Sequence, residues 1–166
     1  MLKTPPDIHI VSAKSEHVSL ILGFIQKLAE YEKLSHEVVA NEKCLQQYLF
    51  SERPAAEVVL AFRGEQALGF ALFFTSFSTF LGRPGIYLED LFVEPEARGA
   101  GIGKALLRYL ARLVVERGYG RLEWSVLNWN QPSIDFYQSL GAVPLDAWTG
   151  YRLTGDALRA LARSKP

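Results

Sequence analysis

The chain has 166 residues, of which 49% are apolar, and its 18 basic and 18 acidic side chains give a formal net charge of zero. These values suit a single globular domain and exclude the basic excess of a nucleic-acid-binding protein. Residues 1–7 lack the apolar stretch of a signal peptide, no segment is long enough to span a membrane, and the one cysteine, Cys44, excludes an internal disulfide, so we expect a soluble cytoplasmic protein.

Strand and helix patterns alternate along the first half of the chain, which predicts an α/β fold with one domain over residues 1–166 and a core over about 8–154. Apolar and cap residues predict, in order, a strand at 8–11, a helix capped by Ser15 that ends near Tyr31, a helix capped by Asn41 that ends at Leu49, and strands at 57–62 and 67–74 joined by a hairpin at 63–66. A polar and aromatic loop is expected at 76–85.

The second half begins with a strand at 86–93, which Pro95 ends. Apolar residues at helical spacing predict a helix from Ile102 that closes at Gly118. The elements expected after it are a strand at 121–127, a helix with Pro132 in its first turn that closes at Gly141, strands at 143–145 and 150–153, and a helix at 155–163 capped by Thr154.

The strongest chemical signal is the strand, glycine turn and helix between residues 87 and 118. Gly99, Gly101 and Gly103 allow close backbone approach, and the helix that follows offers N–H groups and a dipole that favour an anion. Arg98 and Lys104 add positive charge beside the turn. The spacing fits neither the Walker motif nor the dinucleotide fingerprint. We therefore expect a diphosphate of another kind to bind there.

The motif Arg98-x-x-Gly101-x-Gly103 resembles the acetyl-CoA signature of the GNAT superfamily of N-acetyltransferases, and the order of elements is similar over roughly residues 8–153. Three segments make the chain resemble the diamine branch, which comprises the spermidine/spermine acetyltransferases and their thialysine-acetylating relatives. These segments are Leu28-Ala29-Glu30-Tyr31-Glu32, Tyr87-Leu88-Glu89-Asp90-Leu91-Phe92-Val93 and Trp129-Asn130-Gln131-Pro132-Ser133-Ile134-Asp135-Phe136-Tyr137.

The resemblance implies a central mixed, mostly antiparallel sheet whose fourth and fifth strands splay apart, with helices on its flanks. Acetyl-CoA would lie between those strands, and a backbone N–H near Phe92 or Val93 would polarise the thioester carbonyl. The residues implied to bind the cofactor are Leu91, Phe92, Val93, Arg98, Gly99, Ala100, Gly101, Ile102, Gly103, Lys104, Asn130, Gln131, Pro132, Ser133 and Phe136.

Glu89 and Asp90 form an acidic pair inside an apolar strand, which draws attention without any resemblance. Neighbouring strand residues point to opposite faces, so the two acids are expected to have different environments. A buried carboxylate is costly unless it is paired or functional. The pair therefore serves either as part of a structural ion pair or as a cation site and proton acceptor.

Acetyl transfer needs such an acceptor, because an amine with a lysine-like pKa is neutral in only about one molecule per 10³ near neutral pH. The resemblance implies that Glu89 takes the proton, directly or through water, and that Tyr31, Glu32 and Asp90 hold the cationic substrate. As the alternative, Tyr31 and Glu32 only end an amphipathic helix. The residues expected to shape the rest of the acceptor pocket are Glu123, Trp124 and Ser125.

Tyr137 is the candidate general acid, because the departing CoA thiolate needs a proton that a phenol can supply. A tyrosine at this position is otherwise a core residue, as are Trp124 and Trp129. Cys44 is expected to be a small hydrophobe, and His9, His17 and His36 have no partners at metal-ligand spacing. We predict no metal and no covalent acyl-enzyme.

These observations predict direct acetyl transfer, in a ternary complex, from acetyl-CoA to a primary amine of a small cationic acceptor such as a polyamine, a diamine or a thialysine-like amino acid. Two other readings stay open: a protein or peptide N-acetyltransferase, and a non-catalytic acyl-CoA sensor. The loop at 76–85 and Asn128 depart from the spermidine enzymes and put spermidine itself in doubt. The resemblance also implies a homodimer, without nucleic-acid or membrane partners.

Overall fold

The computed structural model describes residues 7–164, which divide into two compact units. The first unit ends at Leu127 and the second begins at Asn128. Residues 1–6, which belong to the stretch expected to lack a signal peptide, fall outside the described range, as do 165 and 166. No helix in the described range is long and apolar enough to cross a membrane.

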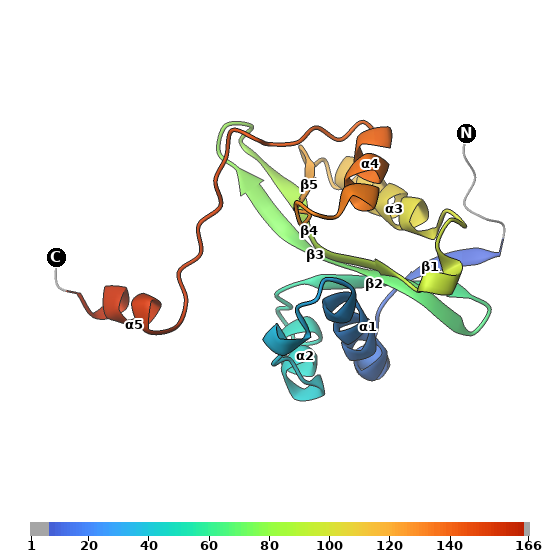
Figure 1. The fold of residues 1–166 in the computed structure, drawn as a ribbon, viewed down its shortest axis with the longest axis horizontal. Helices are drawn as coiled ribbons and strands as arrows, with labels where there is room; N and C mark the ends of the chain where they lie inside the picture. The colour runs from blue at the N-terminus through green and yellow to red at the C-terminus, as the bar shows by residue number, and fades with distance from the viewer. Residues whose placement is uncertain (1–6, 165–166) are drawn as a thin grey trace. The chain divides into compact units, whose positions relative to one another are not determined.

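A five-stranded mixed sheet forms the centre of the first unit, as expected (Figure 1). Its strands follow one another in space in the order of the sequence: β1 Ile8–Ser12, β2 Glu57–Arg63, β3 Gln66–Ser78, β4 Arg83–Val93 and β5 Leu122–Trp124. The first four strands pair antiparallel, whereas β4 and β5 pair in parallel. The parallel pair is possible because a long crossover, which contains the glycine turn and a helix, joins the two strands.

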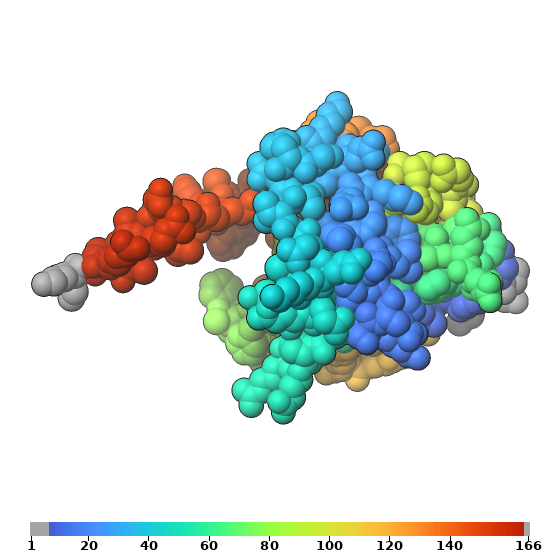
Figure 2. All heavy atoms as spheres, turned by 90° about the horizontal axis from the view of Figure 1, so that it is seen from below, coloured from blue at the N-terminus to red at the C-terminus, as the bar shows by residue number. Residues whose placement is uncertain are grey.

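Helices cover both faces of this sheet. The helices of the first unit are α1 Val18–Tyr31, α2 Glu42–Leu49 and α3 Ile102–Glu116, with short 3-10 turns at Ser15–His17, Ser35–Glu37 and Pro95–Ala97. Figure 1 shows α1 and α2 on one side of the sheet and α3 on the other. Figure 2 shows the atoms of α1 and α2 spread over their face. The second unit contains α4 Gln131–Ser139 and α5 Gly155–Arg163.

The core on the α1 side is made of aromatic and branched side chains. Phe24 of α1 stacks on Phe70 of β3 with 5.4 Å between ring centroids, and it also meets Phe92 of β4 at 5.9 Å. Ile21 and Leu60, which belong to the same cluster, are fully buried. Burial of apolar area contributes about 25 cal/mol per Å² to stability, so this packing holds α1 on the sheet. The C-terminal end of α1 is thereby held near β4.

Most of the expected helix ends are confirmed. The Asn41 side chain caps α2 by accepting a hydrogen bond from the Cys44 N–H at 3.0 Å. Gly118 closes α3 with φ of 68°, and Gly141 follows α4 with φ of 87°. The expected cap at Ser15 is wrong, because this residue lies in a 3-10 turn and α1 begins only at Val18. Thr154 occupies the cap position of α5 without a side-chain hydrogen bond.

The predicted loop at 76–85 is wrong. The β3–β4 ladder continues through it, with Ser76 opposite Gly85 and Ser78 opposite Arg83, so that only 79–82 form the turn. The backbone of this segment has hydrogen-bond partners that its polar composition did not indicate. The Ser78 hydroxyl accepts from the Leu81 N–H at 3.2 Å, and the Pro84 carbonyl accepts from the Gly120 N–H at 2.8 Å. Backbone pairing therefore overrides local composition.

Three predicted strands differ from the structure. The strand expected at 121–127 is limited to Leu122–Trp124, because β4 and β5 stop pairing after Leu88 and Trp124. The segments at 143–145 and 150–153 form no strand, and the Trp148 N–H instead donates to the Leu145 carbonyl in a turn. Their β-rich side chains do not suffice, because a strand also needs a partner for its backbone groups.

Candidate functional site

The glycine turn enters α3 through two left-handed residues. Gly99 has φ of 78° and Gly101 has φ of 82°, a region that side chains other than glycine rarely adopt. Gly101 is the N-cap of α3, and the first helical bond of the ladder joins the Ala105 N–H to its carbonyl. The N–H groups of the first turn, at 102–104, therefore have no partner within the helix. This end of the fifteen-residue α3 suits an anion.

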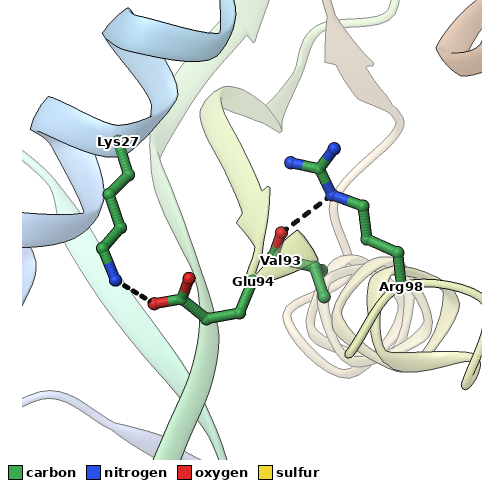
Figure 3. A network of polar contacts seen from close by, with 4 residues as sticks. All are labelled: Lys27, Val93, Glu94 and Arg98. Atoms are coloured by element: carbon green, nitrogen blue, oxygen red, sulfur yellow. Dashed lines mark hydrogen bonds and ion pairs between the residues drawn. The ribbon is translucent and has the colours of Figure 1, made fainter. Parts of the chain in front are cut away.

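Arg98, which was expected beside this turn as a phosphate ligand, is directed to other groups (Figure 3). Its Nε donates a hydrogen bond to the Val93 carbonyl at 3.0 Å. Its guanidinium lies 4.7 Å from the centre of the Tyr31 ring and 5.6 Å from that of Phe92. Figure 3 also shows the neighbouring ion pair between Lys27 of α1 and Glu94. The Arg98 side chain and the Lys27–Glu94 ion pair thus each connect α1 with the end of β4.

One edge of β4 is open beyond Leu88. The last pair of the parallel β4–β5 ladder is Leu88 with Trp124, whereas β4 continues to Val93. The two strands therefore diverge, as the resemblance implied. This leaves backbone groups of β4 facing away from β3 along its last residues.

The antiparallel register identifies which residues of β4 face that open edge. The Glu94 N–H donates to the Leu68 carbonyl, so Glu94 faces β3. Backbone groups of alternate residues in an antiparallel strand point to alternate sides. Phe92 therefore also faces β3, where it pairs with Phe70, whereas Leu91 and Val93 face the open edge. Of the two residues expected to polarise a thioester carbonyl, Val93 has the suitable orientation.

Glu89 is an extra residue in β4. Asp90 pairs with Leu72 and Leu88 pairs with Phe73, so Glu89 has no opposite residue in β3 and forms a bulge. The bulge shifts the alternation of side chains between the two faces of the sheet by one residue. Asp90 shares the α1 face with Leu72, which packs against the cluster beneath α1, whereas Leu88 lies with Phe73 on the other face.

Two carboxylates, Glu89 and Glu32, act on a third, Asp90, at this bulge. Burial, which has the largest effect, and the negative charges of Glu89 and Glu32 together raise the pKa of Asp90 from 3.8 to about 6. Burial also raises the pKa of Glu32. Among residues 7–164 no cation contributes to the shift of Asp90, so this carboxylate is not part of the structural ion pair that was one of the two alternatives. The local field favours a cation on the α1 face of the sheet.

The end of α1 presents Tyr31 and Glu32 through a strained turn. The Leu34 N–H bonds to the Ala29 carbonyl at 2.7 Å and the Lys33 N–H to the Glu30 carbonyl at 3.0 Å, which is a Schellman motif. Its left-handed position holds Lys33, with φ of 62°, where glycine is usual. Such a residue costs on the order of 1 kcal/mol and persists where the surrounding structure demands it.

The residues expected from β5 divide between the two faces. Glu123 pairs with Tyr87 in the ladder and forms an ion pair with Arg121 at 2.6 Å, so its charge is already engaged. The Ser125 hydroxyl forms a 2.7 Å hydrogen bond with that of Tyr87, which stacks on Phe74. Trp124 pairs with Leu88 and lies on the face opposite to Asp90. Of the three, Glu123 and Ser125 therefore share the face of Asp90.

The predicted residues of the second unit lie on α4. The Asn130 side chain caps this helix by accepting from the Ser133 N–H at 3.4 Å, and Pro132 lies in its first turn as expected. The Phe136 and Tyr137 rings are in contact, with centroids 5.4 Å apart. The remaining predicted residue, Gln131, donates from its amide to the Asp135 carboxylate at 2.6 Å.

No group of three or more His, Cys, Asp or Glu side chains among residues 7–164 is arranged to hold a metal ion.

Two residues of the site were not found from the sequence. Tyr87 belongs to one of the three segments that carry the resemblance, but its bond to Ser125 depends on the register of β4 against β5. Gly69 lies opposite the end of β4, where an added Cβ would come within 2.5 Å of the Phe92 carbonyl oxygen. A glycine inside an apolar strand is the signal that points to such a close approach.

Comparisons with known proteins agree with this geometry. The model of the acetyltransferase (GNAT) family matches residues 25–142. The thialysine N-epsilon-acetyltransferase of Bos taurus is 39% identical, over 93% of this chain and 97% of its own length. The L-ornithine N5-acetyltransferase of Arabidopsis thaliana is 31% identical, over 87% and 83%. A solved integron cassette protein from the mobile metagenome of V. cholerae superposes with a TM-score of 0.80 and 30% identity, over 96% of this chain and all of its own.

Proposed function

Because the chain belongs to the GNAT family and is an acetyl-CoA-dependent N-acetyltransferase, we propose that its acceptor is a small cationic molecule with a primary amine. Diamines, polyamines and amino acids with an amine-bearing side chain, such as thialysine and ornithine, belong to this class. The names of the thialysine and ornithine enzymes among its relatives support the amino acids in particular.

The observation that carries this proposal is the cluster of Glu32, Glu89 and Asp90. Burial and the negative charges of Glu89 and Glu32 raise the pKa of Asp90, so the same surroundings that favour a proton there also favour another cation that can replace it. An ammonium group on a flexible stem fits this requirement. Tyr31, one residue before Glu32, offers an aromatic face to the stem of such an acceptor.

Acetyl-CoA is proposed to bind along the open edge of β4 and across the glycine turn. The backbone of Leu91 and Val93 would pair with the pantetheine arm, and the N–H groups at the start of α3 would receive the pyrophosphate. The orientation of Val93 supports its N–H as the donor to the thioester carbonyl. Residues 130–133 and Phe136 of the second unit complete the proposed set.

The proposed chemistry is direct transfer within a ternary complex. Glu89 accepts the proton of the bound ammonium, directly or through water, so that the neutral amine can attack the thioester carbon. The C–N bond forms as the C–S bond breaks, and the nitrogen of the new amide releases its second proton to water. Asp90 and Glu32 hold the remaining positive charge of the acceptor, and Tyr137 gives its phenolic proton to the leaving thiolate.

Three further parts of the proposal concern the whole molecule. Both units are proposed to act as one acetyltransferase domain, because the family match crosses the boundary at Leu127. A homodimer is proposed from resemblance to the diamine branch, and light scattering after size exclusion would measure it. A cytoplasmic location is supported by Cys44, which is a free thiol.

The decisive experiment measures thiol release from acetyl-CoA with the full-length chain and a panel of acceptors. The panel contains thialysine, ornithine, lysine, putrescine, spermidine and a peptide with a free N-terminus. We expect the highest kcat/KM for a small amine with a second charged or polar group. Faster turnover of the peptide would favour a protein acetyltransferase instead, and coenzyme A binding without thiol release for any amine would indicate a sensor.

A further inference from the structure

Arg98 occupies one proposed contact of each ligand at the same time. Its Nε is bonded to the Val93 carbonyl, on the edge proposed for pantetheine, and its guanidinium covers the Tyr31 ring, which is proposed to receive the acceptor. The three residues come from different elements: the end of α1, the end of β4 and the start of the glycine turn. The contact therefore crosses from the cofactor side of the site to the acceptor side.

From this geometry we propose that the Arg98–Tyr31 stack couples the two binding sites, and that breaking the stack is part of binding coenzyme A. This inference rests on the proposed function, because it needs the glycine turn to bind the pyrophosphate. Arg98 is then a positioning residue whose place depends on whether an anion is present.

The direction of the coupling follows from the contacts. An anion at residues 99–104 attracts the guanidinium, which is one residue from the turn, away from Tyr31. The same movement frees an acceptor lone pair of Val93 and the face of Tyr31. It also removes a positive charge from the neighbourhood of the acceptor site. Coenzyme A should therefore raise the affinity for a cationic amine, and by linkage the amine should raise the affinity for coenzyme A.

The size of the effect is set by the contact that must be broken. A cation–π contact at a half-exposed site contributes on the order of 0.5–1 kcal/mol, which corresponds to roughly two- to fivefold in affinity. Removing the ring of Tyr31 should therefore tighten the binding of coenzyme A, although no bond to coenzyme A is added. A purely structural role for Tyr31 would leave this affinity unchanged or weaken it.

The test is calorimetry with coenzyme A alone, on the full-length chain. We expect Tyr31→Leu to lower the Kd by roughly two- to fivefold. Tyr31→Phe, which keeps the ring face, should leave it unchanged, and so should Tyr48→Leu, an exposed tyrosine on α2. In an Arg98→Gln background, Tyr31→Leu should have no effect, because the stack is already absent. Circular dichroism checks that each variant is folded.

The outcomes separate this inference from the proposed function. Absence of coenzyme A binding by the wild type would overturn the cofactor site itself. Wild-type binding with an unchanged or higher Kd in Tyr31→Leu would overturn the coupling and leave the cofactor site intact. As the second arm, titration of thialysine with and without bound coenzyme A should show tighter binding with it, and this difference should disappear in Arg98→Gln.

Discussion

The Tyr87 hydroxyl lies 2.7 Å from the Ser125 hydroxyl, across the point at which β4 and β5 cease to pair. Tyr87 is one residue before the last ladder pair and Ser125 is one residue after it. The bond therefore joins the two strands on the α1 face, next to the place where they diverge. The stack of Tyr87 on Phe74, with centroids 5.3 Å apart, fixes the ring that carries the hydroxyl.

We expect Tyr87→Phe to lower kcat/KM for the amine more than that for acetyl-CoA. Loss of a hydrogen bond between hydroxyls removes about 1 kcal/mol, which corresponds to roughly fivefold. Ser125→Ala should have a similar effect, and the double variant should be no worse than either single one. Steady-state kinetics with both substrates varied measure this. Additive losses would mean that the two hydroxyls act separately, and Tyr48→Phe provides a control.

Asp90→Asn should stabilise the fold while it impairs the enzyme. Burial raises the pKa of Asp90 to about 6, so the folded state binds its proton more tightly than the unfolded state does. Below pH 3.8 both states are protonated and the carboxyl costs nothing, whereas the free energy of unfolding decreases as the pH rises through about 6. At pH 7.5 the substitution should therefore raise the free energy of unfolding by roughly 1–3 kcal/mol.

Urea unfolding at pH 7.5 and below pH 4 measures this difference, which should disappear at the lower pH. Glu65→Gln, in the exposed hairpin between β2 and β3, is the matched control without an expected change. For wild-type protein, kcat/KM for the amine should decrease as the pH falls below about 6, because a protonated Asp90 no longer attracts a cation. Equal stability of wild type and Asp90→Asn at pH 7.5 would contradict the raised pKa.

Gly69→Ala should disturb the open edge of β4. The added methyl group would lie 2.5 Å from the Phe92 carbonyl oxygen, which is backbone and must move. We expect a loss of about 1–3 kcal/mol in stability and a higher KM for acetyl-CoA. Gly23→Ala is the control, because its methyl group meets nothing within 4 Å in α1 and should stabilise the helix by up to about 1 kcal/mol. An unchanged KM in folded Gly69→Ala would mean that the edge does not position the cofactor.

Tyr137→Phe tests the proposed general acid. Its ring can keep the contact with Phe136, so binding should change little, whereas kcat should fall by roughly 10²-fold or more. Stopped-flow measurement of thiol release, with calorimetry of coenzyme A binding, separates chemistry from binding. Tyr151→Phe, in the same unit, should retain full activity. Wild-type turnover by Tyr137→Phe would remove the acid assignment.

The sequence predicted those parts of the fold that depend on local pattern. The spacing of apolar residues located α3, and Gly99 and Gly101 marked the turn before it because only their backbone conformation allows it. The mixed sheet and its divergence came from resemblance and agree with the register. Strand lengths could not be predicted, because a strand ends where its partner leaves, as β5 does at Trp124.

The sequence also identified the carboxylates of the site, but it did not predict every contact that they make. The expectation that Glu89 and Asp90 have different environments is confirmed, because Glu89 is exposed and Asp90 is partly buried, but strict alternation along β4 did not predict the bulge at Glu89. Glu123 was expected to face the substrate, but its neighbour two residues earlier, Arg121, pairs with it. Such contacts depend on side-chain orientation and on residues distant in sequence, which composition and spacing do not determine.

The bulge also makes the length of β4 more important than the identity of many of its side chains. Leu88 and Phe92 are four positions apart and belong on one face of a regular strand, yet each is buried in a different half of the core. Conservative exchanges along this strand preserve that arrangement. Loss of a single residue between them would remove the bulge and leave both halves of the strand on their present faces, whereas gain of one would have to widen the bulge or turn one half of the strand over.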